Sequence, residues 1–168
     1  MAGSSAGANL AFQAAGTLAT GDPRRSEVVA GWSSLTELGK MTNDHYSCDD
    51  SPNTNYCWKG VLRDQNNCDI RINPACEADY TAASNRPSYL SSGAPAFIAN
   101  AESELVPLQN ALDFQDWLTN FVHVTNFLCE GPGSGHGQGY LFDSGCGGPP
   151  PPTVFDQTES FFHPYLWP

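Results

Sequence analysis

The sequence is poor in basic residues and has no long hydrophobic run. It contains 7 Lys and Arg residues against 18 Asp and Glu residues, which gives a formal net charge of -11 at pH 7. Because such a chain repels phosphate groups, we do not expect nucleic acids or anionic membrane surfaces as partners. Hydrophobic residues make up 40% of the 168 positions but lie in short clusters, so no membrane span is expected. The length predicts one soluble, globular domain with a single core.

Two further absences concern cysteine spacing and targeting. No Cys-x-x-Cys motif is present, so disulfides are favoured over a structural zinc site. The even number of cysteines predicts disulfides and a secreted or cell-envelope location, with connectivity left open and neighbour pairing as the simplest choice. The start lacks the basic and apolar regions of a signal peptide, so we expect Met1 to be an internal methionine of a longer parent. The six cysteines are Cys48, Cys57, Cys68, Cys76, Cys129 and Cys146.

Short helical and strand patterns alternate along the chain. This alternation predicts a parallel sheet with flanking helices, the α/β class. We expect helices at residues 6–19, 108–120 and 153–166, the last one interrupted by Pro164, and strands at residues 27–33, 94–101 and 121–129.

Residues 34–92 do not share this alternation. They are polar, contain four cysteines and show little periodicity, so we expect an insertion or cap within a single domain spanning residues 1–168, pinned by disulfides. A cluster of Asp49, Asp50, Asn53 and Asn55 lacks the central glycine and terminal glutamate of a calcium loop. It predicts a polar surface, and no metal or cofactor site is expected in the chain.

The first residues contain a Gly-x-Ser-x-Gly pattern, Gly3-Ser4-Ser5-Ala6-Gly7, directly before the first expected helix. This is typical of a nucleophile elbow, where the chain turns sharply from strand to helix around a strained serine and glycines avoid collisions. Ser5 is then the candidate nucleophile, and its neighbour Ser4 is expected to be a turn residue. The backbone N–H of Ala6 is the candidate donor to an oxyanion.

A serine nucleophile needs a general base, and four histidines are available. His136 lies in the glycine-rich segment 131–139 after the last expected strand, where it is free of the sheet, and it is the candidate base. The alternatives are structural or surface histidines: His45 in the insertion, His123 within a strand and His163 beside Pro164.

Four blocks in this order and spacing resemble the α/β-hydrolase esterase and lipase group, in its branch of small secreted or cell-envelope enzymes. They are GSSAGANLA (3–11), VVAGWSS (28–34), GAPAFIANAESELVPLQNALDF (93–114) and EGPGSGHG (130–137). The resemblance implies the C-terminal portion of an α/β-hydrolase fold, with the N-terminal strands missing, acting on a small-molecule ester without a cofactor. Cys68 and Cys76, ahead of the sequence AAS (82–84), also resemble a disulfide loop of that branch.

The acid of the implied triad departs from the commonest pattern. Relatives usually carry an aspartate four residues before the proline of a Val-Pro pair, where this chain has Ser103. Glutamate is an accepted triad acid, and the Glu-Leu-Val-Pro run resembles a variant with the acid one place later. We therefore predict Glu104, with Glu102 as the runner-up. Asp113 and Asp116 are expected on the exposed face of the following helix.

The resemblance also implies acyl transfer, in which His136 removes the Ser5 proton and Glu104 supports the imidazole. A second oxyanion donor would come from a loop that precedes the elbow in relatives. We therefore expect these 168 residues to be weak or inactive by themselves, and the exposed edge of the sheet to favour self-association.

Two other functions remain open from the sequence. A serine peptidase of the prolyl-oligopeptidase type shares the elbow and the order of the triad. A non-catalytic secreted domain, whose insertion binds a partner while the triad has decayed, is favoured by Ser103 at the usual acid position. Ser5 and His136 argue against that decay.

Overall fold

Four parallel strands form one sheet at the centre of the described structure. The computed structural model describes residues 1–18, 21–36, 38, 73–85, 89, 93–104, 106–143, 145–146 and 152–167. The strands are β1 (Ala2–Ser4), β2 (Val29–Trp32), β3 (Ala96–Ala101) and β4 (Asn126–Gly131), and they lie in the order β1-β2-β3-β4. All three pairings are parallel, which confirms the predicted α/β class.

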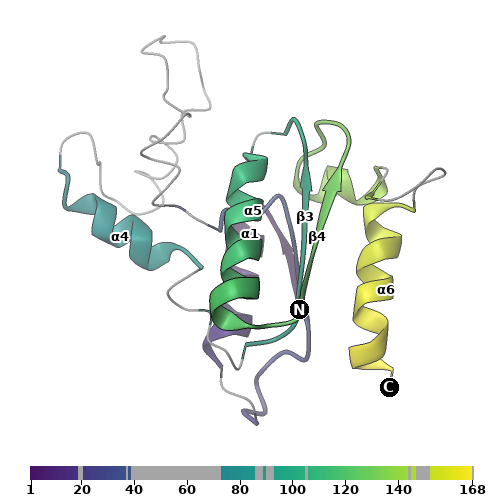
Figure 1. The fold of residues 1–168 in the computed structure, drawn as a ribbon, viewed down its shortest axis with the longest axis horizontal. Coiled ribbons are helices and arrows are strands. Elements are labelled where there is room, and N and C mark those ends of the chain that lie inside the picture. The colour runs from purple at the N-terminus through teal and green to yellow at the C-terminus, as the bar shows by residue number, and fades with distance from the viewer. Residues whose placement is uncertain are drawn as a thin grey trace.

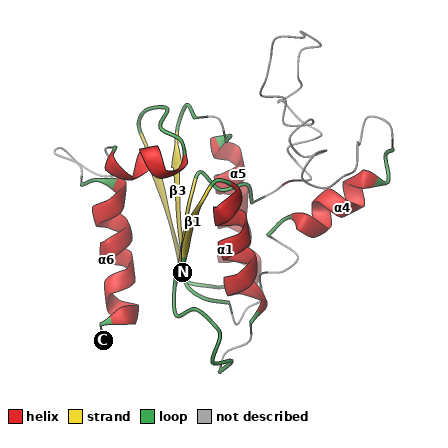
Figure 2. Ribbon diagram, turned by 180° about the vertical axis from the view of Figure 1, so that it is seen from behind, coloured by secondary structure: helices red, strands yellow, loops and turns green. Residues whose placement is uncertain are grey.

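Helices cover both faces of the sheet. Helices α1 (Ala6–Thr17) and α5 (Leu108–Trp117) pack on one face, and α6 (Val154–Leu166) packs on the other (Figures 1 and 2). The three predicted helices are therefore confirmed, although each observed helix is shorter. Among the described residues, no helix has both the length and the apolar character needed to span a bilayer.

The two faces of the sheet carry separate hydrophobic cores. On the α1 and α5 side, Phe12, Ile98 and Phe114 belong to one buried cluster. On the α6 side, Phe97, Tyr140 and Val154 belong to another. Since side chains alternate along a strand, the neighbours Phe97 and Ile98 enter opposite cores. All six residues of β3 are buried, as expected of a central parallel strand.

The predicted strand at residues 121–129 is wrong in its first part. The chain leaves α5 through a π-helical turn, Leu118–Val122, and β4 begins only at Asn126. His123 ends this turn in a left-handed conformation with φ 59°, and its N–H bonds to the Leu118 carbonyl. The β-branched residue Val122 is buried, so it fills the core from the turn instead of from a strand.

Pro164 does not interrupt the last helix as expected. Helix α6 continues through it to Leu166, and the N–H of Trp167 bonds to the His163 carbonyl beyond the proline. The start of α6 is fixed by a capping box in which Thr153 and Asp156 exchange side-chain and backbone hydrogen bonds. Pro164 has no backbone N–H, so α6 continues through this position with one intrahelical hydrogen bond fewer.

The predicted pairing of neighbouring cysteines is wrong for Cys129 and Cys146. Both are free thiols, and both sulfur atoms contact the side-chain amide of Gln157, at 3.0 Å and 3.1 Å. Burial raises the pKa of the Cys129 thiol. Cys76 is disulfide-bonded, and the remaining three cysteines lie outside the described residues.

Most of the expected insertion at residues 34–92 also lies outside the described residues. The part that is described contains helix α4 (Cys76–Ala83), which lies apart from the sheet beyond α1 and α5 (Figure 1). Its buried residues Cys76 and Tyr80 pack with Leu35, Leu38 and Val106 in a third small core. The disulfide-pinned cap therefore stays a prediction.

Candidate active site

Four side chains of the candidate site follow the carboxyl ends of four adjacent strands. Ser5 follows β1, Ser33 follows β2, Glu104 follows β3 and His136 follows β4. Because the strands are parallel and in register, these ends lie along one edge of the sheet. This edge is where open α/β sheets bind their ligands.

Ser5 occupies the sharp turn between β1 and α1. Its backbone has φ 51° and ψ −126°, and its N–H donates to the Trp32 carbonyl at 2.9 Å. A Cβ on Gly3 would collide with the backbone of Gly7, so a glycine is needed there. The expectation that Gly7 is needed for the same reason is wrong, because a Cβ at Gly7 would meet nothing within 4 Å.

His136 lies between Ser5 and Glu104. Its Nε2 is 3.1 Å from the Ser5 Oγ, and its Nδ1 is 2.8 Å from the Glu104 Oε2. The imidazole side chain is 33% exposed, whereas the glutamate side chain is fully buried. A chain of hydroxyl, imidazole and carboxylate with this geometry can move a proton from the hydroxyl to the ring.

Glu104 is the carboxylate that reaches the imidazole. Its second oxygen accepts the Ala101 N–H at 3.2 Å, and burial raises the pKa of its carboxyl against the opposing effect of its hydrogen bonds to Ser33, His136 and Ala101. Glu102 is exposed, and its backbone N–H bonds to the carbonyl of Gly131 at the end of β4. Of the two predicted acids, the structure brings Glu104 to His136.

Ala6 is the first residue of α1, directly after the serine. The first N–H to bond within the helix is that of Ala8, which donates to the Ser5 carbonyl at 3.0 Å. The N–H of Ala6 precedes this bond and is one of the donors that a helix leaves free at its N-terminus. Ala6 is also exposed.

The remaining candidates take no part in this arrangement. Ser4 ends β1 and is half-buried. His123, expected within a strand, instead lies exposed at the end of the π-helical turn, where its Nδ1 contacts the Thr119 carbonyl at 3.1 Å. His163 is exposed on α6. The positions of His45 and of the Asp49, Asp50, Asn53 and Asn55 cluster lie outside the described residues.

Ser33 belongs to the site but was not among the sequence candidates. Its buried hydroxyl accepts the N–H of Gly137 at 2.7 Å, and its interaction with the Glu104 carboxyl lowers the pKa of that group. The sequence signal that could have identified Ser33 was its position directly after a buried strand. That strand lies next to the one that leads to Ser5.

Among the described residues, no group of three or more His, Cys, Asp or Glu side chains could hold a metal ion.

Several solved structures resemble this arrangement of strands and helices. A truncated carbohydrate esterase from gut microbiota is 18% identical with a TM-score of 0.56, and the match covers 78% of this chain and 50% of that one. A thermophilic esterase from the Planctomycetes species Thermogutta terrifontis is 15% identical with a TM-score of 0.60, over 99% of this chain and 55% of that one. The parallel sheet and its flanking helices match the fold of these esterases. Esterase B from Lactobacillus rhamnosis is also similar, with 14% identity, a TM-score of 0.52 and coverage of 78% and 40%.

The chain spans about half the length of the structures that it matches. No family model and no curated protein matches its sequence. At identities of 14–18% these matches establish the fold. What the site does therefore has to be argued from its own geometry.

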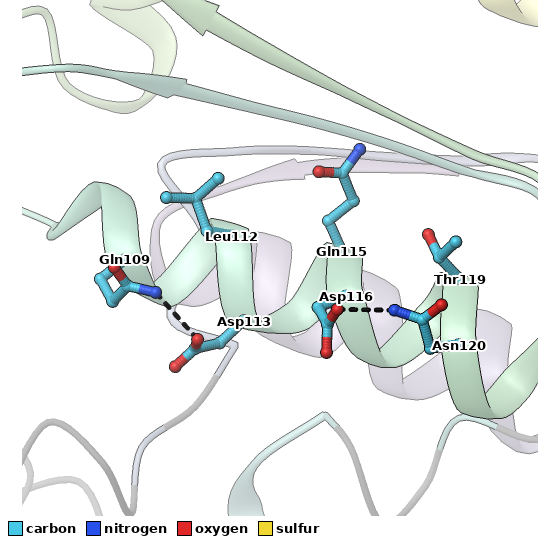
Figure 3. Close-up of a pocket in the computed structure, with 7 residues that line it drawn as sticks. All are labelled: Gln109, Leu112, Asp113, Gln115, Asp116, Thr119 and Asn120. Atoms are coloured by element: carbon cyan, nitrogen blue, oxygen red, sulfur yellow. Dashed lines mark hydrogen bonds between the residues drawn. The ribbon is translucent and has the colours of Figure 1, made fainter.

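A surface depression of about 580 Å³ lies away from these four side chains, along α5 and the π-helical turn. Figure 3 shows two hydrogen-bonded pairs one turn apart, Gln109 with Asp113 and Asn120 with Asp116. The two bonds measure 2.9 Å and 2.6 Å. Asp116 is exposed and Asp113 is half-buried. The lining residues are Gln109, Leu112, Asp113, Gln115, Asp116, Thr119 and Asn120.

Proposed function

We propose that this chain carries the catalytic serine, histidine and acid of a serine hydrolase that acts on carboxylic esters of small molecules. The observation that carries the proposal is the continuous hydrogen-bonded chain from Ser5 through His136 to the buried Glu104. The esterase folds of the similar structures support the substrate class.

In the proposed reaction, the Ser5 oxygen attacks the ester carbonyl carbon while His136 takes its proton at Nε2. The developing oxyanion accepts the N–H of Ala6 at the start of α1. His136 then gives the proton to the leaving alcohol, and an acyl-enzyme remains on Ser5. Water, deprotonated by the same imidazole, releases the acid.

Glu104 has an orienting and electrostatic role in this proposal. Its carboxylate accepts a hydrogen bond from Nδ1, which leaves Nε2 free to receive the Ser5 proton and stabilises the imidazolium that forms. Burial raises the pKa of the Glu104 carboxyl, and the hydrogen bonds from Ala101, Ser33 and His136 oppose that rise. These donors therefore favour the ionised carboxylate.

We further propose that the 168 residues alone hydrolyse esters slowly. By resemblance, α/β-hydrolases take a second oxyanion donor from a loop ahead of the elbow, and these 168 residues cover about half of the similar structures. Lacking one oxyanion donor typically lowers the rate by about a hundred- to a thousand-fold. Exposure of the β1 edge also favours pairing with another chain.

A fluorophosphonate probe and a p-nitrophenyl ester test these proposals. We expect the probe to label wild-type chain and Ser4→Ala but not Ser5→Ala, because Ser4 lies beside the nucleophile outside the hydrogen-bonded chain. Ester turnover is expected to be slow and to disappear in Ser5→Ala.

Two results would contradict the proposals. Equal labelling of wild type and Ser5→Ala would mean that Ser5 is not activated and would favour a non-catalytic domain. Fast ester turnover, comparable with that of full-length esterases and abolished by Ser5→Ala, would contradict the proposed weakness of the chain. Cleavage of peptides in preference to esters would favour the peptidase alternative.

A further inference from the structure

Ser33 holds a backbone conformation that serine rarely adopts. Its φ is 53°, in the left-handed region that favours glycine, and its side chain is fully buried. The N–H of Ser33 donates to the Ala99 carbonyl at 2.8 Å, which ties this conformation to β3. Such strain is typical of functional sites. Glycine would adopt this conformation without strain but has no hydroxyl, so the hydroxyl is what serine contributes here in place of glycine.

The Ser33 hydroxyl connects two separate loops. It accepts the N–H of Gly137 at 2.7 Å. Because it accepts there, its own proton is free to point to the Glu104 carboxylate, and its interaction lowers the pKa of that carboxyl.

These contacts fall on the two residues that orient the imidazole. Gly137 directly follows His136 and has φ 58°, so its bond to Ser33 fixes the backbone next to the ring. Glu104 accepts from the imidazole through Oε2 and from the Ala101 N–H through Oε1. Ser33 is thus a direct link between the acid loop and the histidine loop at the end of β2.

On the basis of the function proposed above, we propose that Ser33 is a positioning residue, whose hydroxyl holds the Glu104 carboxylate and the His136 loop in register for proton transfer from Ser5. It does not touch the reacting atoms and acts only through Glu104 and Gly137. The interaction of the hydroxyl with the carboxylate favours its charged form, which is the form that stabilises an imidazolium.

The adjacent serine offers a matched control. Ser34 is also fully buried, but its hydroxyl has no hydrogen-bond partner in the described structure. Ser34→Ala therefore removes a buried hydroxyl without breaking either link. Ser33→Gly removes the bridging hydroxyl and relieves the backbone strain, and this relief offsets the loss of the hydrogen bond from Gly137 in the free energy of unfolding.

The first measurement is the second-order rate constant for fluorophosphonate labelling of Ser5 across pH. We expect Ser33→Gly to lower it by about ten- to a hundred-fold, as for the loss of a hydrogen bond to a charged group. Its acid limb should shift to higher pH, because the Glu104 carboxyl loses a donor that lowers its pKa. Ser33→Thr, which keeps a hydroxyl, should regain part of the rate, and Ser34→Ala should match wild type.

The second measurement does not depend on reactivity. The Nδ1 proton of His136, bonded to a buried carboxylate, should give a downfield proton NMR signal that disappears in His136→Ala. We expect Ser33→Gly to shift or broaden this signal and Ser34→Ala to preserve it.

The two measurements separate this inference from the proposed function. If wild-type Ser5 fails to react with the probe, the proposed function fails, while the NMR signal still tests the role of Ser33. The role of Ser33 would be overturned if Ser33→Gly left the NMR signal unchanged and, wherever labelling occurs, matched wild type in labelling rate and pH profile. This holds even if Ser5 is reactive.

Discussion

Ser5 combines backbone strain with partial exposure. At φ 51° and ψ −126° it occupies a conformation that side-chain-bearing residues avoid, and such strain costs of order 1–3 kcal/mol. The N–H of Ser5 bonds to Trp32 of the neighbouring strand, and Gly3 lets the turn close tightly against Gly7. The packing of the sheet thus stabilises a turn that presents the hydroxyl at the start of α1.

The two adjacent glutamates give a direct test of the acid. We expect Glu104→Gln to slow fluorophosphonate labelling of Ser5 by about 10²- to 10⁴-fold, because an amide cannot stabilise the imidazolium and can favour the wrong tautomer. Glu102→Gln removes the same charge as Glu104→Gln. Because Glu102 is exposed, the labelling rate of this variant should stay within about twofold of wild type. A larger loss in Glu102→Gln than in Glu104→Gln would assign the acid to the other residue.

Residues of the site differ in how far the sequence could predict them. Ser5 was marked by its glycines and the following helix, and His136 by its glycine-rich segment. The choice of Glu104 over Glu102 rested on resemblance, since both are loop carboxylates with the same local chemistry. Ser33 could not be chosen over Ser34 because its role depends on a positive φ and on two distant loops that meet only after folding.

At the scale of elements, the buried parallel strands were easier to predict than the ends of the elements. Strand β3 is buried along its whole length, which gives a continuous apolar run. The run Phe121 to Val124 looks equally β-like, yet Val122 lies in a π-helical turn, because burial and β-branching do not require an extended backbone. Leu10 is 63% exposed, although it falls on the apolar spacing of α1.

Close packing of α1 on β2 depends on a glycine that the sequence pattern does not single out. A Cβ on Gly31 would collide with the Phe12 ring, which is fully buried against Phe114 at a centroid distance of 5.1 Å. We expect Gly31→Ala to lower the free energy of unfolding by about 1–3 kcal/mol through overpacking. Urea unfolding followed by circular dichroism measures this change.

Gly7 provides the matched control for Gly31. A Cβ there would meet nothing within 4 Å, and Gly7 lies in the first turn of α1. Gly7→Ala should therefore leave the free energy of unfolding unchanged or raise it by up to about 1 kcal/mol. Equal stabilities of wild type and Gly31→Ala would show that β2 and α1 can separate at little cost.

At the scale of the whole molecule, the two cores on the faces of the sheet each bury a tyrosine hydroxyl. Tyr89 lies in the core beneath α1 and α5 and donates to the Ala94 carbonyl, whereas Tyr140 lies beneath α6 and donates to the Asn100 carbonyl at 3.1 Å. Burial raises the pKa of both phenols above the ordinary value of 10.0. Both cores therefore depend on tyrosines that stay neutral.

This burial predicts a loss of stability at alkaline pH. Below pH 10 the phenols are protonated in both states, so they add no pH dependence. Above pH 10 the unfolded chain releases these protons while the folded chain retains them, so the free energy of unfolding falls as pH rises, by up to about 1.4 kcal/mol per pH unit for each tyrosine. Urea unfolding at intervals from pH 8 to pH 11 measures the slope.

Tyr140→Phe separates this effect from general alkaline denaturation. The variant loses one hydrogen bond, to the Asn100 carbonyl, and should be less stable than wild type at pH 8. It also removes one of the two phenols whose pKa is raised by burial. The free energy of unfolding of Tyr140→Phe should therefore fall less steeply between pH 10 and pH 11 than that of wild type, and the two stability curves should converge. Parallel curves for wild type and Tyr140→Phe would mean that Tyr140 ionises alike in the folded and unfolded states, against its burial beneath α6.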